Sequence, residues 1–147
     1  QPGSDVLVMA AAVADLRRNT ALASKLAKKD LQQALVSGWA EVPDLLSNLT
    51  GQRSPGQLVL GFSALTGSDA HLLERAESKR LEKGCDLMMV NPVDRVGQGF
   101  GDQPNGGWLL GDGWRRELPV TTKLSLAHQL LDALVEARDQ AAASMES

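Results

Sequence analysis

The stretch VLVMAAAVAD, residues 6–15, decides the fold class of this chain. Residues 6–13 are continuously apolar rather than alternating, a pattern typical of a strand covered on both faces in a parallel sheet. The small residues within the run allow another backbone to approach closely. Ligands of open α/β sheets bind beyond the carboxyl ends of the strands, so Asp15 and the alanines before it form the first candidate site.

Two further apolar runs, residues 57–62 and 85–91, are bounded by polar residues or glycine and predict two more buried strands. The carboxyl ends of parallel strands lie at the same edge of a sheet. The residues that end these runs, Phe62 with Ser63 and then Asn91, are therefore expected to face one crevice together with Asp15.

Helices are predicted between these strands. Residues 68–83 form one, with Ser68 as the N-cap, Gly84 as the stop and an apolar stripe of Leu72, Leu73, Ala76 and Leu81. The crossover that contains it should be right-handed. A shorter helix opens at Pro43 and Asp44, since proline suits a first helical turn and aspartate suits its positive dipole end. It runs through Leu45, Leu46 and Leu49 and ends at Gly51.

The C-terminal part of the chain has a different character. The glycine-rich residues 97–107 predict a loop, and residues 108–118 predict an antiparallel hairpin about residues 111–113. Residues 122–140 predict a helix that packs on the sheet through Leu124, Ala127, Leu131, Leu134 and Val135, and the tail at 141–147 is expected to fray. The sequence thus predicts one α/β domain, residues 1–147, with a mainly parallel sheet and a small antiparallel appendage.

The composition argues against several classes of protein. With 147 residues, 43% of them hydrophobic and 22% charged, the chain has the length and composition typical of one globular domain rather than of a disordered segment. An aromatic content of 3% and a net charge of -3 argue against nucleic-acid binding. The sequence contains no signal-peptide pattern and no apolar run long enough to span a membrane. A single cysteine, Cys85, suits a reducing compartment, so a cytoplasmic location is expected.

Two features near the N-terminus suit an anionic ligand, and each has a plainer alternative. Asp15 suits a ribose hydroxyl or a metal ion, with a helix cap or a turn residue as an equal alternative. The basic cluster Lys25, Lys28 and Lys29 suits phosphate oxygens, although a solvated charge run is the commoner explanation.

A second basic group, Arg75, Lys79 and Lys83, lines one stripe of the predicted helix with like charges, which favours a facing anion. Glu82 lies within reach of Lys79, so a partly compensated solvent face remains an equal alternative. The sequence holds no GxGxxG motif in a strand-to-helix context, no GxxxxGK[ST] phosphate loop, no zinc-ligand spacing and no Ser-His-Asp set. The remaining reactive residues, interpreted as surface or packing residues, are His71, His128 and Cys85.

Short motifs in a fixed order across nearly the whole chain resemble phosphopantothenate–cysteine ligase, the ligase part of the bifunctional coenzyme A biosynthesis flavoprotein. The most specific motif is AAVAD at residues 11–15. The others, in chain order, are residues 25–29, 42–45 (VPDL), 60–62 (LGF), 79–83 (KRLEK) and 86–91 (DLMMVN), then Gly99 and Gly101 with Asn105, and Lys123.

The resemblance implies a Rossmann-like three-layer fold and a CTP-dependent ligase. CTP with Mg²⁺ would activate the carboxylate of 4'-phosphopantothenate as an acyl-cytidylate with release of pyrophosphate, and the amine of L-cysteine would then displace CMP to form an amide. Lysines and magnesium would offset charge where a carboxylate attacks a triphosphate. The resemblance implies a catalytic role for Lys25, on a mobile flap, in handling the acyl-cytidylate, and no residue is assigned as a metal ligand. The implied CTP contacts are Ala10, Ala11, Ala12, Asp15, Lys25, Val42, Pro43, Asp44, Leu45, Phe62, Lys79 and Lys83.

Three positions depart from the family's pattern. Val42 stands where the family usually has asparagine, which removes a side-chain oxygen that would cap the next helix or contact the base. Leu65 stands in place of a common glutamate, and Pro92 in place of the aspartate that usually follows Asn91. The change at Val42 leaves the preference between CTP and ATP open.

The family's glycine-rich opening, with its DPVRxxxNxSSG-like stretch, has no counterpart in this sequence. The chain is therefore expected to be the C-terminal part of a ligase domain, with weak or no activity alone. The resemblance also implies a homodimer or larger assembly, and FMN only in a fused decarboxylase domain that this chain does not contain. The alternatives are a catalytically incomplete nucleotide-binding or dimerisation fragment and, least favoured, an unrelated Rossmann-like oxidoreductase.

Overall fold

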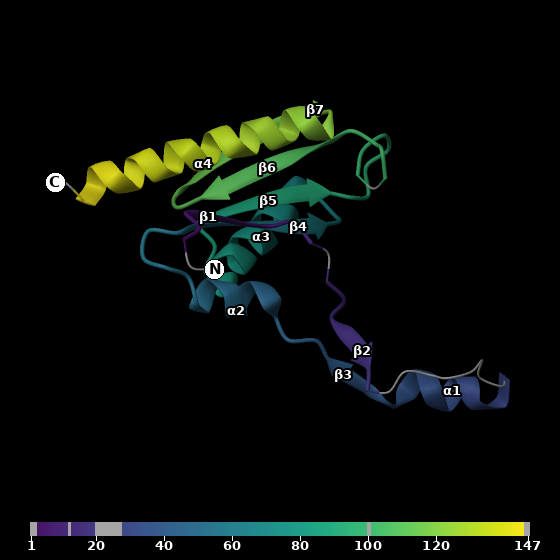
Figure 1. Ribbon diagram of the computed structural model, residues 1–147. Coiled ribbons are helices and arrows are strands. Elements are labelled where there is room, and N and C mark those ends of the chain that lie inside the picture. Colours follow the sequence, from purple (N-terminus) through teal and green to yellow (C-terminus); the bar gives the residue numbers. More distant parts are fainter. Residues whose placement is uncertain (1–2, 12, 20–27, 100, 146–147) are drawn as a thin grey trace.

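The computed structural model describes residues 3–11, 13–19, 28–99 and 101–145 as an α/β fold built on a five-stranded sheet (Figure 1). A separate two-stranded sheet lies away from it. In chain order the elements are β1 (Val6–Met9), β2 (Leu16–Arg18), α1 (Lys28–Val36), β3 (Trp39–Glu41), α2 (Leu45–Gly51), β4 (Leu58–Leu65), α3 (Asp69–Lys83), β5 (Leu87–Pro92), β6 (Asn105–Gly111), β7 (Trp114–Thr121) and α4 (Lys123–Met145).

The main sheet is mixed and has the order β1-β4-β5-β6-β7. β1, β4 and β5 are parallel, while β6 and β7 add to β5 in antiparallel fashion. The α/β fold class is confirmed. The antiparallel hairpin predicted about residues 111–113 also forms, and it extends the main sheet at β5. The small separate antiparallel sheet is made by β2 and β3, neither of which the sequence pattern predicted.

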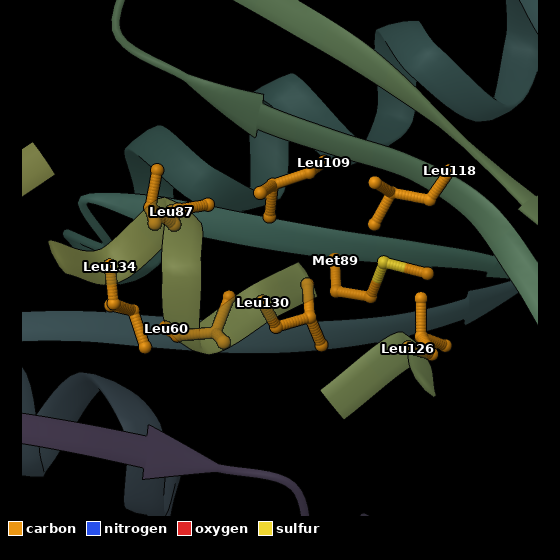
Figure 2. Packing of buried hydrophobic residues seen from close by; sticks show 9 residues of the cluster. Leu60, Leu87, Met89, Leu109, Leu118, Leu126, Leu130 and Leu134 are labelled. Carbon is orange, nitrogen blue, oxygen red and sulfur yellow. The ribbon is translucent and has the colours of Figure 1, made fainter. Parts of the chain in front are cut away.

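Helices cover both faces of the main sheet and give three layers. On one face, α4 packs its leucines against the strands (Figure 2). On the other face, α3 contributes Leu72 and Ala76, both fully buried, to a second core. β5 is buried along its whole length because both layers cover it. The first core comprises Leu60, Leu87, Met89, Leu109, Leu118, Leu126, Leu130, Ala133 and Leu134.

β1 is shorter and more exposed than its apolar run predicted. The strand ends at Met9, opposite Gly61 of β4, rather than at Val13, and the Val8 side chain is 44% exposed. In the described part of the chain β1 pairs with β4 alone, so it is an edge strand. β4 continues past this register to Leu65, and the ends of the parallel strands are therefore not level.

The predicted face of α3 is the buried one except at its end, whereas α4 buries largely a different face from the one predicted. In α3, Leu72 and Ala76 are buried as expected, but Leu81 is exposed and Arg80 is buried in its place, paired with Glu77 at 2.7 Å. In α4, the predicted Leu124, Leu131 and Val135 are 70%, 53% and 48% exposed, and Ala127 is exposed as well. Apolar residues occur on two faces of α4 at the same helical spacing, so periodicity alone could not identify the face that the sheet covers. α4 also extends to Met145, so the described part of the tail is helical rather than frayed.

The small sheet belongs to an arm, defined here as β2, α1 and β3, which projects from the main sheet (Figure 1). Arg18 joins the arm's elements, because its Nη1 donates to the Ala34 carbonyl at 2.8 Å and its guanidinium lies 5.5 Å from the centre of the Trp39 ring. The base of the arm adjoins the cavity described next.

Candidate functional site

A cavity of about 670 Å³ opens beside the carboxyl end of β1. Its walls come from the residues after β1, the base of the arm, the start of α2, the middle of β4 and the last two turns of α3. The lining residues are Met9, Ala11, Val13, Ala14, Asp15, Leu16, Glu41, Val42, Pro43, Asp44, Leu45, Leu46, Phe62, Lys79, Glu82 and Lys83.

This cavity brings together nine of the twelve residues predicted to contact a nucleotide: Ala11, Asp15, Val42, Pro43, Asp44, Leu45, Phe62, Lys79 and Lys83. Ala10 is exposed and is not part of the lining. Ala12 and Lys25 lie outside the described residues, so their contacts stay predictions. Lys28 and Lys29 open α1 in the arm.

The base of the arm holds Asp15 beside the segment that leads into α2. The Val42 amide donates to the Asp15 carbonyl at 2.9 Å, and Leu16 pairs with Glu41 in the two-stranded sheet. Within the part of the chain that the structure describes, no hydrogen bond to the Asp15 carboxylate is found, and the strand β2, not a helix, begins directly after Asp15. The helix-cap interpretation of Asp15 therefore does not hold, and the carboxylate lines the cavity.

Asp44 is fixed at the entrance to α2, where it acts as the N-cap. Its Oδ1 accepts from the Ser47 amide at 3.0 Å, and its Oδ2 accepts from the Ser47 hydroxyl at 2.9 Å. Asp44 thus satisfies a helix-terminal amide that has no partner within the helix. The hydrogen bond from Lys83 lowers the pKa of Asp44 to about 2, with further lowering by the Ser47 amide.

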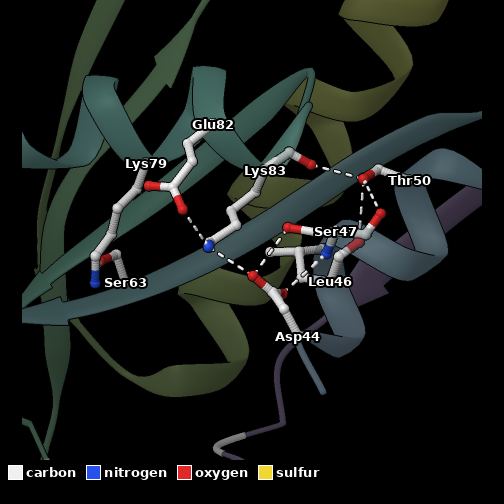
Figure 3. Close-up of polar contacts among 8 residues, drawn as sticks. All are labelled: Asp44, Leu46, Ser47, Thr50, Ser63, Lys79, Glu82 and Lys83. Atoms are coloured by element: carbon white, nitrogen blue, oxygen red, sulfur yellow. Dashed lines mark hydrogen bonds and ion pairs between the residues drawn. The ribbon is translucent and has the colours of Figure 1, made fainter. Parts of the chain in front are cut away.

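The two cavity lysines of α3 have different surroundings (Figure 3). Lys83 Nζ lies 2.6 Å from Asp44 Oδ2 and 2.6 Å from Glu82 Oε1, so two carboxylates neutralise it and raise its pKa. Lys79 Nζ lies 3.4 Å from the Ser63 hydroxyl, and the ion pairs found in the described residues do not include it. Arg75, the third member of the predicted basic stripe, is exposed and does not line the cavity.

Three details of the predicted crevice are wrong. Asn91 is buried and donates from Nδ2 to the Gly106 carbonyl at 3.3 Å, outside the cavity. Ser63 is also buried and contacts the cavity only through Lys79. Both differences follow from the early end of β1, which places the cavity level with Phe62 rather than with the ends of β4 and β5. Glu82 pairs with Lys83 rather than with Lys79.

Sequence reasoning missed Glu41, Glu82, Met9, Val13, Leu16 and Leu46 as lining residues. All six lie next to a predicted contact in the sequence, and this adjacency could have identified them. Glu41 depends on the pairing of β2 with β3, which the sequence pattern did not indicate.

The cavity is acidic in its described walls. Four carboxylates (Asp15, Glu41, Asp44 and Glu82) and two ammonium groups (Lys79 and Lys83) line it, a formal net charge of −2. Nowhere in the described ranges do three or more His, Cys, Asp or Glu residues gather in a way that could hold a metal ion. The histidines His71 and His128 are exposed, and burial raises the pKa of the Cys85 thiol to about 11, so Cys85 is a packing residue as predicted. None of the described helices has the length and apolar character to cross a membrane.

Comparison with known proteins gives a consistent result. Residues 1–137 match the family described as DNA/pantothenate metabolism flavoprotein C-terminal domain. The chain is 38% identical over 141 residues to the coenzyme A biosynthesis bifunctional protein CoaBC of Mycobacterium tuberculosis, covering 91% of this chain and 33% of that protein. It is 33% identical over 132 residues to the protein of the same name from Bacillus subtilis, covering 89% of this chain and 31% of that protein. The chain thus spans about a third of the length of these relatives.

Two solved structures share the fold. The C-terminal domain of a coenzyme A biosynthesis bifunctional protein CoaBC superposes with a TM-score of 0.63 at 24% identity, covering 90% of this chain and 54% of that one. The DNA/pantothenate metabolism flavoprotein from Streptococcus pneumoniae superposes with a TM-score of 0.64 at 23% identity, covering 90% of this chain and 61% of that one.

Proposed function

The chain belongs to the family of the DNA/pantothenate metabolism flavoprotein C-terminal domain, and on this premise we propose that it serves coenzyme A biosynthesis as part of a ligase. The specific reaction that we propose is the CTP-dependent joining of 4'-phosphopantothenate to L-cysteine through an acyl-cytidylate. The cavity beside β1 is the proposed nucleotide site.

The observation that carries the proposal is the convergence of the predicted contacts on one cavity. They come from separate segments of the chain, after β1, before α2, in β4 and in α3, and they line a space of about 670 Å³. Sites for cofactors and similar small molecules usually measure roughly 300–1,000 Å³. The lining includes apolar side chains at Met9, Leu46 and Phe62, which suit contact with a base, and the ammonium groups of Lys79 and Lys83, which suit a phosphate chain.

The negative charge of the cavity bears on how a triphosphate is held. Lys79 and Lys83 alone do not offset the four lining carboxylates, still less a triphosphate as well. Mg²⁺ typically binds through one or two carboxylates together with substrate phosphates, and such a site needs no cluster of three protein ligands. The cavity fits this arrangement, with Asp15, which has no ion-pair partner among the described residues, as the carboxylate best placed to share a nucleotide-borne ion.

In the proposed reaction each residue has a limited task. Lys79 binds phosphate oxygens, and Lys83 does so next to the fixed Asp44. Mg²⁺ bound with the nucleotide would lower the repulsion between the attacking carboxylate and the phosphate that it attacks. Lys25 would add positive charge at the same centre, and the apolar walls would limit access of water that would otherwise hydrolyse the acyl-cytidylate.

A second candidate follows from the share of its relatives that this chain spans. A piece of about a third of their length, whose cavity lies beside the edge strand β1, suits a nucleotide-binding fragment that is catalytically incomplete by itself. The two candidates differ in one measurement. Release of pyrophosphate from CTP in the presence of 4'-phosphopantothenate and L-cysteine supports the ligase, while CTP binding without release supports the fragment.

Replacement of Asp15 by asparagine tests the nucleotide site. The Asp15→Asn chain should bind CTP with Mg²⁺ about 10- to 150-fold more weakly, since hydrogen bonds that involve a charged group are worth about 1.5–3 kcal/mol. It should melt at the same temperature as the unchanged chain, because the hydrogen bond found for Asp15 in the described part of the fold is made by its main-chain carbonyl, which the substitution keeps. Isothermal titration gives the affinity, and Asp5→Asn, on the loop before β1, is the matched control. An unchanged affinity would remove Asp15 from the site.

A further inference from the structure

Glu82 has no task in the proposed reaction, yet its carboxylate forms an ion pair with Lys83, which the proposed reaction uses to bind phosphate. Lys83 Nζ lies 2.6 Å from Glu82 Oε1 and 2.6 Å from Asp44 Oδ2 (Figure 3). Two carboxylates therefore share one ammonium group that lines the cavity. An incoming phosphate has to compete with at least one of them.

The two carboxylates are held very differently. Asp44 also accepts hydrogen bonds from the Ser47 amide and the Ser47 hydroxyl, and these bonds fix it as the cap of α2. The Glu82 side chain is 64% exposed, and its bond to Lys83 is the sole hydrogen bond found for it among the residues that the structure describes. Loss of Glu82 from Lys83 therefore costs one exposed ion pair, whereas loss of Asp44 also uncaps a helix. Of the two carboxylates, Glu82 is therefore the one that separates from Lys83 at the lower cost in free energy.

Lys79 provides the internal comparison. It lies one turn before Lys83 on the same helix and lines the same cavity, but its described partner is the neutral hydroxyl of Ser63 at 3.4 Å. Of the two lysines, only Lys83 starts with its charge fully compensated. A phosphate contact to Lys79 displaces no carboxylate, and a contact to Lys83 does.

We propose that Glu82 is a built-in competitor for the phosphate site, which holds Lys83 while the cavity contains no anion and swings out to solvent when a triphosphate binds. The inference rests on the proposed function, since it concerns the same nucleotide site. Asp44 stays in place throughout as the fixed partner of Lys83. Glu82 therefore sets the affinity for the triphosphate end of a nucleotide and leaves the choice of base unaffected.

The test compares Glu82→Gln with the unchanged chain. The substitution keeps the shape of the side chain and removes its charge, and Glu82→Ala removes the competing group altogether. Glu74→Gln, which removes a carboxylate from an exposed position of the same helix, is the control for net charge. Inorganic tripolyphosphate and CTP, each with Mg²⁺, are titrated into all four proteins by calorimetry at low and at high ionic strength.

Both Glu82 variants are expected to bind tripolyphosphate about 2- to 5-fold more tightly at low salt, which corresponds to about 0.4–1 kcal/mol for an exposed ion pair. The same factor should apply to CTP, and it should shrink at high salt because screening weakens the competition. Glu74→Gln should match the unchanged chain. Thermal melting of all variants should coincide, since position 82 is exposed.

Two other results would overturn the inference, and they differ in what they say about the proposed function. Equal affinities in the unchanged chain and both Glu82 variants, or weaker binding in the variants, would reject the competitor role while leaving a working nucleotide site. Absence of triphosphate binding in all four proteins would reject the proposed function and the inference together.

Discussion

The Gly107→Ala chain is expected not to fold. Gly107 has a φ of +142°, and a Cβ placed on it would lie 1.9 Å from the Val90 carbonyl oxygen of the neighbouring strand β5. That oxygen belongs to the backbone of a fully buried central strand, which cannot move aside without breaking its pairing with β4. The clash and the backbone strain together should cost more than about 4 kcal/mol, a large part of the roughly 5–15 kcal/mol that stabilises a typical domain.

Gly113→Ala is the matched control for Gly107→Ala. Gly113 lies in the turn between β6 and β7 with a φ of +71°, and a Cβ there would meet nothing within 4 Å. Only the cost of the left-handed conformation remains, about 1–2 kcal/mol. Circular dichroism should show a cooperative melt for Gly113→Ala and none for Gly107→Ala. If the two variants had the same melting temperature, the register in which β5 pairs with β6 would be wrong.

Replacement of Lys25 by glutamine is expected to stop amide formation in a protein that carries this chain together with the rest of a ligase domain. In the first chemical step the carboxylate of 4'-phosphopantothenate attacks the triphosphate of CTP. Positive charge beside the reacting groups stabilises the transition state, in which the two anions come together. Removal of one such preorganised group typically costs about 10²- to 10³-fold in rate. The described charges of the cavity make the loss more severe, because their net value of −2 leaves no surplus of positive charge to take over.

The matched control for Lys25 is Arg17→Gln, which removes an exposed positive charge from β2. Pyrophosphate release and amide formation are followed with CTP, 4'-phosphopantothenate and L-cysteine, and thermal melting checks that both variants remain folded. The Lys25 variant should lose at least about 100-fold in turnover, while the Arg17 variant should keep it. Unchanged turnover in the Lys25 variant would reject its catalytic role.

The parts of the fold that sequence reasoning predicted well have a single local cause. Gly84 ends α3 in the left-handed conformation with a φ of +67°, and Asp44 caps α2. A single residue therefore sets each of these helix boundaries. β4 and β5 are buried strands, as their continuous apolar runs predicted. The separate sheet of β2 and β3 was not predictable in this way, because it consists of two strands of three residues without an alternating pattern.

Elements whose position depends on a partner were predicted less well. The buried face of α4 is set by the sheet on which the helix packs, and its second apolar face, with Leu124 and Leu131, is equally periodic. The end of β1 is set by its register with β4, which no local pattern encodes. Both errors arise because a hydrophobic pattern reports which residues are apolar and not which neighbour covers them.

For the candidate site, the resemblance located the lining better than the charge pattern did. It supplied Val42, Pro43 and Leu45, which carry no charge and form no motif by themselves, and all three line the cavity. The charge pattern placed Arg75 with Lys79 and Lys83 but could not show that Arg75 lies outside. The ion pairs of Lys83 with Asp44 and with Glu82 join two segments far apart in the sequence, and they could be found only in the three-dimensional structure.

The central claim is that the cavity beside β1 is a nucleotide site suited to CTP with Mg²⁺. Isothermal titration of the chain with CTP and Mg²⁺, ATP and Mg²⁺, and NADH tests it most directly. Saturable binding of CTP with Mg²⁺ and no binding of NADH is the expected result, and the ATP titration measures how far Val42 relaxes the preference for the base. Binding of NADH with no binding of either triphosphate would contradict the account.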